Sequence, residues 1–261
     1  MNPFLDHPPL IFAASLLMLW FCAWFGAAVL RRRGDLDAGL REDFSLILTS
    51  SLTLLGLIIG FSFSMAISRY DVRKTYEEAE ANAIGTEYVR VDFMQTADAA
   101  KLKALLRRYT VERILFYTTD DSRELPRIVA QCAALQNDLW SAVRGPAALQ
   151  PNPVMALVIS GMNDVLNSQG YTQAAWWNRI PLGAWTLMAL IATLCNLLIG
   201  YGARKLASSS PMLWVLPLVV AISFFLIADI DSPRGGLIRV VPQNLNALLT
   251  TLPAAADVLR D

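Results

Sequence analysis

Four long stretches of the chain carry no charged side chain, and the charged residues gather in the segments between them. The uncharged windows cover residues 8–30, 44–68, 180–203 and 206–228, and they are 23, 25, 24 and 23 residues long. A helix needs roughly 20 apolar residues to cross the hydrocarbon core of a bilayer. The pattern therefore predicts four transmembrane helices, which we place at residues 10–30, 44–68, 181–201 and 211–228.

The segment between the second and third predicted spans has a different pattern. It carries 13 basic and 13 acidic side chains, and its apolar residues recur at the three- and four-residue spacing of amphipathic helices. Because the residues directly after the second span contain no proline, we expect that span to continue as one long helix. We predict an all-α fold with four parts: an N-terminal transmembrane hairpin (1–68), an inserted helical, water-exposed domain (69–180), a C-terminal transmembrane hairpin (181–228) and a C-terminal tail (229–261).

Composition narrows the classes of function. The 261 residues are 55% hydrophobic and 17% charged with a net charge of zero, whereas an average soluble domain has about 25% charged residues. This composition excludes a soluble enzyme, a secreted disulfide scaffold and a nucleic-acid binder. The single histidine, His7, and three cysteines without metal-ligand spacing supply neither a catalytic base with a nucleophile nor a metal site. We therefore predict no enzymatic activity and no cofactor.

The second predicted span carries a stripe of small and weakly polar residues. Its members recur every three or four positions, the spacing of one helix face: Thr49, Thr53, Gly56, Gly60 and Ser64. Such a stripe is typical of close helix packing; the alternative is a pore-lining face, where small residues leave room and hydroxyls replace lost hydration. No ionisable residue lies within any span, which argues against a proton-coupled carrier or a voltage sensor. A passive channel with an apolar constriction is compatible with this pattern.

Several short motifs follow this stripe along the chain. They are Gly60-Phe61, then Arg69-Tyr70-Asp71 with Arg73, then Glu80-Ala81-Asn82-Ala83-Ile84-Gly85-Thr86. Together they resemble the bestrophin-like integral membrane family of bacteria and, more distantly, the bestrophin ion channels. After the last span, Asp231-Ser232-Pro233-Arg234-Gly235-Gly236 and Gln243-Asn244-Leu245 are similar to the segment that follows the last bestrophin span. The order of two spans, a helical domain and two spans matches that family along essentially the whole chain.

The resemblance implies a function and a set of site residues. Bestrophins are pentameric ion channels whose second spans ring a central pore with an apolar neck. This chain is therefore expected to form a homo-oligomer, a pentamer, that conducts inorganic ions passively across a lipid bilayer. By resemblance, Phe61 matches the neck phenylalanine, and Leu57 and Thr53 match the positions one and two turns earlier. Thr53 departs from the apolar preference of the family at its position.

The resemblance also implies a location. It places the chain in the bacterial cytoplasmic (inner) membrane as a multi-pass protein, with the helical domain in the cytoplasm. The basic residues that flank the predicted spans number six on each side. Charge by itself therefore predicts no orientation.

The polar residues after the second span have two interpretations each. Besides a functional role, Arg69, Asp71 and Arg73 fit interfacial snorkelling and helix pairing. Glycine and asparagine are poor helix formers, so their presence in one expected helix suggests a tight contact, either with another protomer or with the tail. We favour that contact over ion binding for Glu80, Asn82, Gly85 and Thr86.

Two acidic residues follow the last span. In animal bestrophins a calcium clasp is built from an acidic run in this region, whereas this chain has only Asp229 and Asp231, with Arg234 nearby among Pro233 and Gly235. Calcium takes about 6–8 oxygen ligands. We therefore expect an ion pair or a helix-cap contact here, and no metal site.

A second class of function fits the same organisation. A membrane-anchored scaffold or sensor, whose helical domain binds a partner, also needs spans and a polar helical domain. The mass of the protein in detergent separates the two hypotheses, because a monomer or dimer has too few copies to form a ring.

Overall fold

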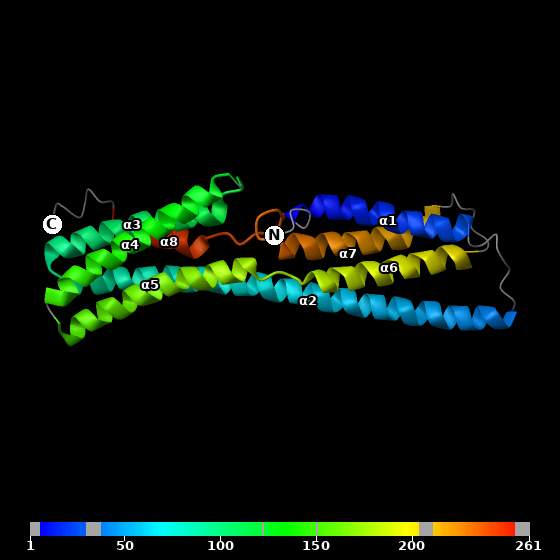
Figure 1. Ribbon diagram of the computed structural model, residues 1–261, viewed down its shortest axis with the longest axis horizontal. Coiled ribbons are helices and arrows are strands. Elements are labelled where there is room, and N and C mark those ends of the chain that lie inside the picture. The colour runs from blue at the N-terminus through cyan, green and yellow to red at the C-terminus, as the bar shows by residue number, and fades with distance from the viewer. Residues whose placement is uncertain (1–5, 30–37, 122, 150, 204–210, 254–261) are drawn as a thin grey trace. The chain divides into compact units, whose positions relative to one another are not determined.

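The computed structural model describes residues 6–29, 38–121, 123–149, 151–203 and 211–253, and all regular elements in these ranges are helices (Figure 1). They are α1 (Pro8–Ala28), α2 (Ala38–Arg90), the 3-10 turn η3 (Val91–Phe93), α3 (Thr96–Thr118), α4 (Leu125–Leu149), α5 (Pro153–Trp177), α6 (Leu182–Gly202), the 3-10 turn η4 (Pro211–Trp214), α7 (Val215–Asp231) and α8 (Gln243–Thr251). The predicted all-α fold class is confirmed for these residues.

Four stretches of the described chain are helices long and apolar enough to cross a membrane, judged by length and composition. They are Pro8–Ala28, Arg41–Phe93, Pro153–Gly202 and Pro211–Asp231, which include α1, most of α2, α5 with α6, and α7, and their order is that of the uncharged windows. The first predicted span differs at its end, because α1 stops at Ala28 and residue 30 lies outside the described residues. As predicted, the second span continues into one helix, α2, which is 53 residues long.

The fourth predicted span differs from the observed helix at both ends. Its first four residues form the 3-10 turn η4, and the α-helix runs from Val215 to Asp231 rather than ending at residue 228. The prediction placed an α-helical start at Pro211 and overlooked Pro217. Pro217 has no N–H to bond the carbonyl of Leu213 and its ring crowds that carbonyl, so the α-helix begins two residues before it.

The chain divides into two compact units. The apolar unit comprises Met1–Tyr70 and Arg179–Arg239, and the polar unit comprises Asp71–Asn178 and Val240–Asp261. Helix α2 contributes its first part to the apolar unit and the remainder to the polar unit. The residues after α7 are also shared, since the segment up to Arg239 belongs to the apolar unit and α8 to the polar unit.

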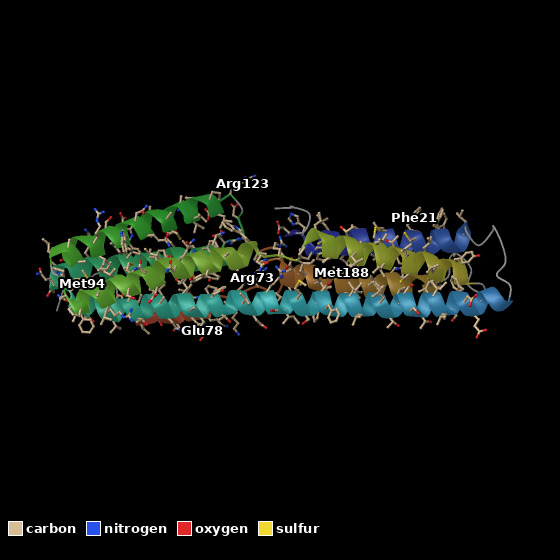
Figure 2. All side chains as sticks on the ribbon, turned by 60° about the horizontal axis from the view of Figure 1, so that its bottom comes forward. Phe21, Arg73, Glu78, Met94, Arg123 and Met188 are labelled. Carbon is tan, nitrogen blue, oxygen red and sulfur yellow. The ribbon has the colours of Figure 1, made fainter. Side chains whose placement is uncertain are left out.

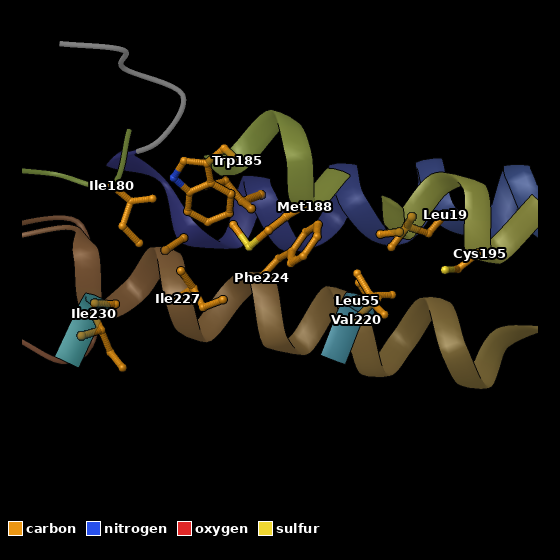
Figure 3. Packing of buried hydrophobic residues seen from close by; sticks show 14 residues of the cluster. Leu19, Leu55, Ile180, Trp185, Met188, Cys195, Val220, Phe224, Ile227 and Ile230 are labelled. Carbon is orange, nitrogen blue, oxygen red and sulfur yellow. The ribbon is translucent and has the colours of Figure 1, made fainter. Parts of the chain in front are cut away.

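In the apolar unit, α1 packs against both α6 and α7 (Figure 1). Figure 3 shows Trp185 and Met188 of α6 meeting Phe224 of α7 in the buried cluster, to which α2 adds Leu55. Glycines let α1 and α6 approach closely. A Cβ at Gly26 would lie 2.9 Å from the backbone nitrogen of Tyr201, and a Cβ at Gly200 would overlap the backbone of α1. Small residues thus fix the α1–α6 crossing.

In the polar unit, α3 packs against α4 and α8, and α4 packs against α5 (Figure 1). Each helix buries one apolar stripe, as the three- and four-residue spacing predicts. The core residues include Leu102, Leu106, Tyr109, Ile128, Leu139, Val158 and Met162. Asn152 caps the start of α5, because its side chain accepts the backbone N–H of Met155 at 2.8 Å.

Candidate functional site

One face of α2 in the apolar unit is packed and the opposite face is open. Leu55, Ser62 and Ala66 are buried on the packed face. The open face carries the predicted pore residues: Leu57 is 53% exposed and Phe61 is 64% exposed. Four-residue spacing places these two residues one above the other. The exposed face therefore presents a leucine and a phenylalanine one helical turn apart.

The predicted small-residue stripe lies on this same open face. Thr49, Thr53 and Ser64 are exposed, and a Cβ at Gly56 or Gly60 would meet no described atom within 4 Å. Within the described chain these glycines therefore serve no helix packing, in contrast to Gly26 and Gly200 in α1 and α6. The stripe is therefore exposed on the surface of a single copy of the chain.

Thr53 stands at the position where an apolar residue is expected from the family resemblance. Its hydroxyl Oγ1 donates to the backbone carbonyl oxygen of Thr49 at 2.9 Å. The hydroxyl hydrogen is thus used within the helix, which is a common local contact for threonine. The methyl group of Thr53 and the lone pairs of its oxygen remain available on the outside of the helix. This side is therefore less polar than a threonine with a free hydroxyl hydrogen.

The motif residues directly after the stripe separate into different environments. Arg69 and Tyr70 are half-buried and Asp71 is exposed, and Arg69 lies 3.5 Å from the sulfur of Met65. The structure does not bring Arg69, Asp71 and Arg73 together as one charged cluster at the surface. Arg73 is only 1% exposed (labelled in Figure 2).

Snorkelling therefore does not describe Arg73, which is buried between helices. Its Nε donates to the backbone carbonyl oxygen of Ala175 at 3.3 Å. Ala175 lies in the last turn of α5, where carbonyl groups have no partner within the helix and a positive charge is favoured. This acceptor explains why the charged group is buried.

Glu80 is fully buried in the polar unit and is held by two helices. It forms an ion pair with Arg113 of α3, whose Nη2 lies 3.1 Å from Glu80 Oε2. Tyr117 of α3 and Thr172 of α5 donate to the same carboxylate oxygen at 3.2 Å. Burial and the nearby carboxylate raise the pKa of Tyr117, so its hydroxyl keeps its proton and donates. Glu80 thus makes a structural contact between helices of its own chain.

The remaining signature residues lie beside α8. A Cβ at Gly85 would lie 3.1 Å from Leu248 of α8, while Asn82 and Thr86 are exposed. These residues line a groove of about 490 Å³ between α2 and α8, together with Ala81, Val89, Asn244, Ala247, Leu248 and Thr251. The structure thus places these residues beside the tail, and a contact with another protomer stays a prediction.

Sequence reasoning missed Glu77, which is buried. Its carboxylate accepts the backbone N–H of Leu245 at 2.9 Å and the side-chain amide of Asn244 at 2.7 Å. Both donors lie in the first turn of α8, where a negative charge is stabilising. The available signal was the Gln243-Asn244-Leu245 motif, which needs an acceptor for its free backbone N–H groups.

The two acidic residues of the tail motif are buried in the apolar unit. Asp229 accepts the backbone N–H groups of Leu237 and Ile238 at 2.7 and 2.9 Å. Asp231 accepts the backbone N–H of Ile180 at 3.1 Å, and its other oxygen lies 3.4 Å from Arg179.

The ion pair therefore involves Arg179, where the sequence suggested Arg234. Arg179 also pairs with Asp6. Pro233 and Arg234 are half-buried in the turn after α7, and a Cβ at Gly235 would overlap the backbone oxygen of Asp6. Among the described residues, no group of three or more His, Cys, Asp or Glu side chains could hold a metal ion.

Comparison with known proteins gives the family. A model of the Bestrophin-like domain matches residues 13–245, whereas no curated protein matches the chain. Crystal structures of a bacterial bestrophin homologue from Klebsiella pneumoniae share the fold. One, of a tryptophan-to-alanine variant, has a TM-score of 0.63 at 13% identity and covers 95% of this chain and 96% of its own. Another, phased on zinc, has a TM-score of 0.63 at 14% identity and covers 96% of each chain. The chain therefore belongs to the Bestrophin-like family, as its sequence motifs indicate.

Proposed function

We propose that this chain is a subunit of a homo-oligomeric ion channel in the bacterial inner membrane, with a pore lined by the open face of α2. The observation that carries the proposal is the division of α2 into a packed face and an open face. The open face combines Leu57 and Phe61 with glycines that nothing described covers. Inorganic ions pass through this pore passively.

The chemistry of the open face supports a pore with an apolar neck. Leucine and phenylalanine side chains on neighbouring turns form an apolar constriction when several copies face one axis, and such constrictions gate by excluding water. Gly56 and Gly60 leave space beside them. No ionisable residue lies in residues 44–68, so the neck carries no proton relay or voltage sensor.

A ring requires several copies, and we propose five from the family resemblance. Two features support an assembly of copies: the open stripe of α2 and the groove between α2 and α8, each presenting small residues to the outside. We assign residues 69–180 to a helical domain in the cytoplasm, inserted between the hairpins 1–68 and 181–228 and followed by the tail 229–261.

Ion flux into liposomes tests this proposal. Phe61→Ala widens the neck and should change the flux several-fold, whereas Phe21→Ala should leave it unchanged. Phe21 is a matched control, because it is 53% exposed on α1 and lies outside the proposed pore. Mass measurement in detergent fixes the number of copies. Vesicles that contain a verified oligomer but pass no inorganic ion would overturn the proposal and favour the scaffold hypothesis.

A further inference from the structure

Glu87 is a buried acidic residue to which no described residue is hydrogen-bonded through its carboxyl group. It lies on α2 in the polar unit, is 0% exposed, and neither of its carboxylate oxygens is hydrogen-bonded to a described residue. A buried carboxylate is costly in its ionised form when nothing stabilises the charge. The side chain is therefore kept in place by something other than polar contacts.

The side chain packs against a glycine on the facing helix. A Cβ at Gly161 of α5 would overlap Glu87 Oε2 and would lie 2.6 Å from Nη1 of Arg90. Every other residue type at position 161 would push the carboxyl group out of its site. The carboxyl group of Glu87 thus fills the space that Gly161 leaves between α2 and α5 at this level.

Two charged groups face the carboxyl group, one from each helix. Arg90, one turn further along α2, favours the ionised form, and Asp164 of α5 opposes it. Burial is the strongest influence and raises the pKa of Glu87 to about 8. Among the described residues no ion pair joins Glu87 to Arg90. At neutral pH the carboxyl group therefore holds a proton.

Water can reach α2 and α5 one helical turn away from the Glu87–Gly161 contact. Asp164 lines a groove of about 380 Å³ between α2 and α5, together with Tyr76, Ala79, Ala83, Asn167, Ser168 and Tyr171. Ala83 precedes Glu87 by one helical turn. An ionised Glu87 that moves toward this groove to be hydrated leaves its place against Gly161.

We propose that the Glu87–Gly161 contact is a proton-operated latch between α2 and α5. With the proton bound, the neutral carboxyl group stays against Gly161 and the two helices remain in contact. When the O–H bond breaks, the proton passes to water in the groove, the carboxylate seeks hydration, and the contact opens. This inference does not depend on the proposed channel function.

Hydrogen exchange of the full-length protein in detergent tests the latch. The measured quantity is the protection of the α5 peptide around Gly161 between about pH 5 and pH 9, corrected for intrinsic exchange. Because the pKa is raised in the closed state, opening becomes easier as the pH rises, and protection should fall about tenfold per pH unit up to about pH 8. Glu87→Gln should show no such fall, and Glu78→Gln, an exposed acid on the same helix, should behave as the wild type. Equal pH dependence in the wild type and Glu87→Gln would overturn the latch.

Infrared spectroscopy provides a readout that does not require the substituted protein to fold. The wild type at pH 6 should show the carbonyl stretch of a protonated carboxylic acid, and this band should disappear above about pH 8. Gly161→Ala should shift this titration toward the ordinary range of glutamate, because the carboxyl group no longer fits its site. Absence of a band that titrates near neutral pH in the wild type would contradict the proposal.

Discussion

The carboxylate of Glu80 and the guanidinium of Arg113 form an ion pair that is fully buried, although the two residues are 33 positions apart. Removing one member of such a pair leaves a buried charge without a partner. We predict that Glu80→Ala lowers the free energy of unfolding of the polar unit by about 3–5 kcal/mol. Denaturation in detergent, followed by circular dichroism, measures this loss. The exposed Asp138→Ala should stay within about 0.5 kcal/mol of the wild type, and equal effects would contradict a structural role for the pair.

Glu77 is predicted to hold α8 against the polar unit. Glu77→Ala removes the acceptor of the Leu245 backbone N–H and of the Asn244 amide, which should destabilise α8 by about 0.5–2 kcal/mol. The loss is expected as faster hydrogen exchange across residues 243–251. Glu78→Ala is the matched control, since the neighbouring carboxylate is exposed. Unchanged exchange in Glu77→Ala would mean that packing alone holds the helix.

The close crossing of α1 and α6 should be sensitive to a single methyl group. In Gly200→Ala the added Cβ would overlap the backbone of Ala23 and lie 3.0 Å from the nitrogen of Ala27, and neither can yield as a flexible side chain would. We expect a loss of about 1–3 kcal/mol, seen as a lower melting temperature in detergent. Gly183→Ala adds the same group to α6 in open space and should be neutral or stabilising by up to about 1 kcal/mol.

Stability should depend on pH through Glu87. The pKa of a glutamate in the unfolded chain is about 4.3, and burial raises that of Glu87 to about 8. The folded state therefore holds a proton that the unfolded state releases. The contribution of this group to the free energy of unfolding falls as the pH rises between these values, by about 1.4 kcal/mol per pH unit. Melting temperatures of the wild type and Glu87→Gln should coincide near pH 4 and diverge in favour of the variant at higher pH. Parallel curves would contradict a raised pKa.

The helices of this fold follow from local sequence signals, and the buried polar contacts do not. Uncharged windows locate the apolar helices, and the absence of proline directly after residue 68 predicts that the second span continues as one long helix. The partner of Glu77 lies 168 positions away, at a distance that no helical spacing can encode. In the sequence, Gly161 is only a poor helix former within an expected helix. The structure shows that it lies against the carboxyl group of Glu87.

The candidate pore residues could be named from the sequence because they belong to a motif on one helix face. Their exposure in the folded chain could not be predicted, since a stripe of small residues is typical of helix packing and is also compatible with pore lining. The structure shows the packed face of α2 at Leu55 and Ala66 and leaves Leu57 and Phe61 open. The burial of Arg73 could not be predicted either, because it depends on the end of α5, about one hundred residues later.

The central claim is that the open face of α2 lines a pore. Blocking the ion flux with a charged thiol reagent tests this claim most directly. Every variant in this test is made in a Cys22→Ala background, because Cys22 is the partly exposed cysteine that the reagent could modify. The other two cysteines are buried. In this background Leu57→Cys places a thiol on the proposed pore face, and Leu190→Cys places one on α6 at a similar exposure of 56%. We predict that the reagent, added to liposomes that conduct ions, abolishes the flux through the Leu57→Cys channel and leaves Leu190→Cys unaffected. Flux through Leu57→Cys that persists after complete modification would contradict the account.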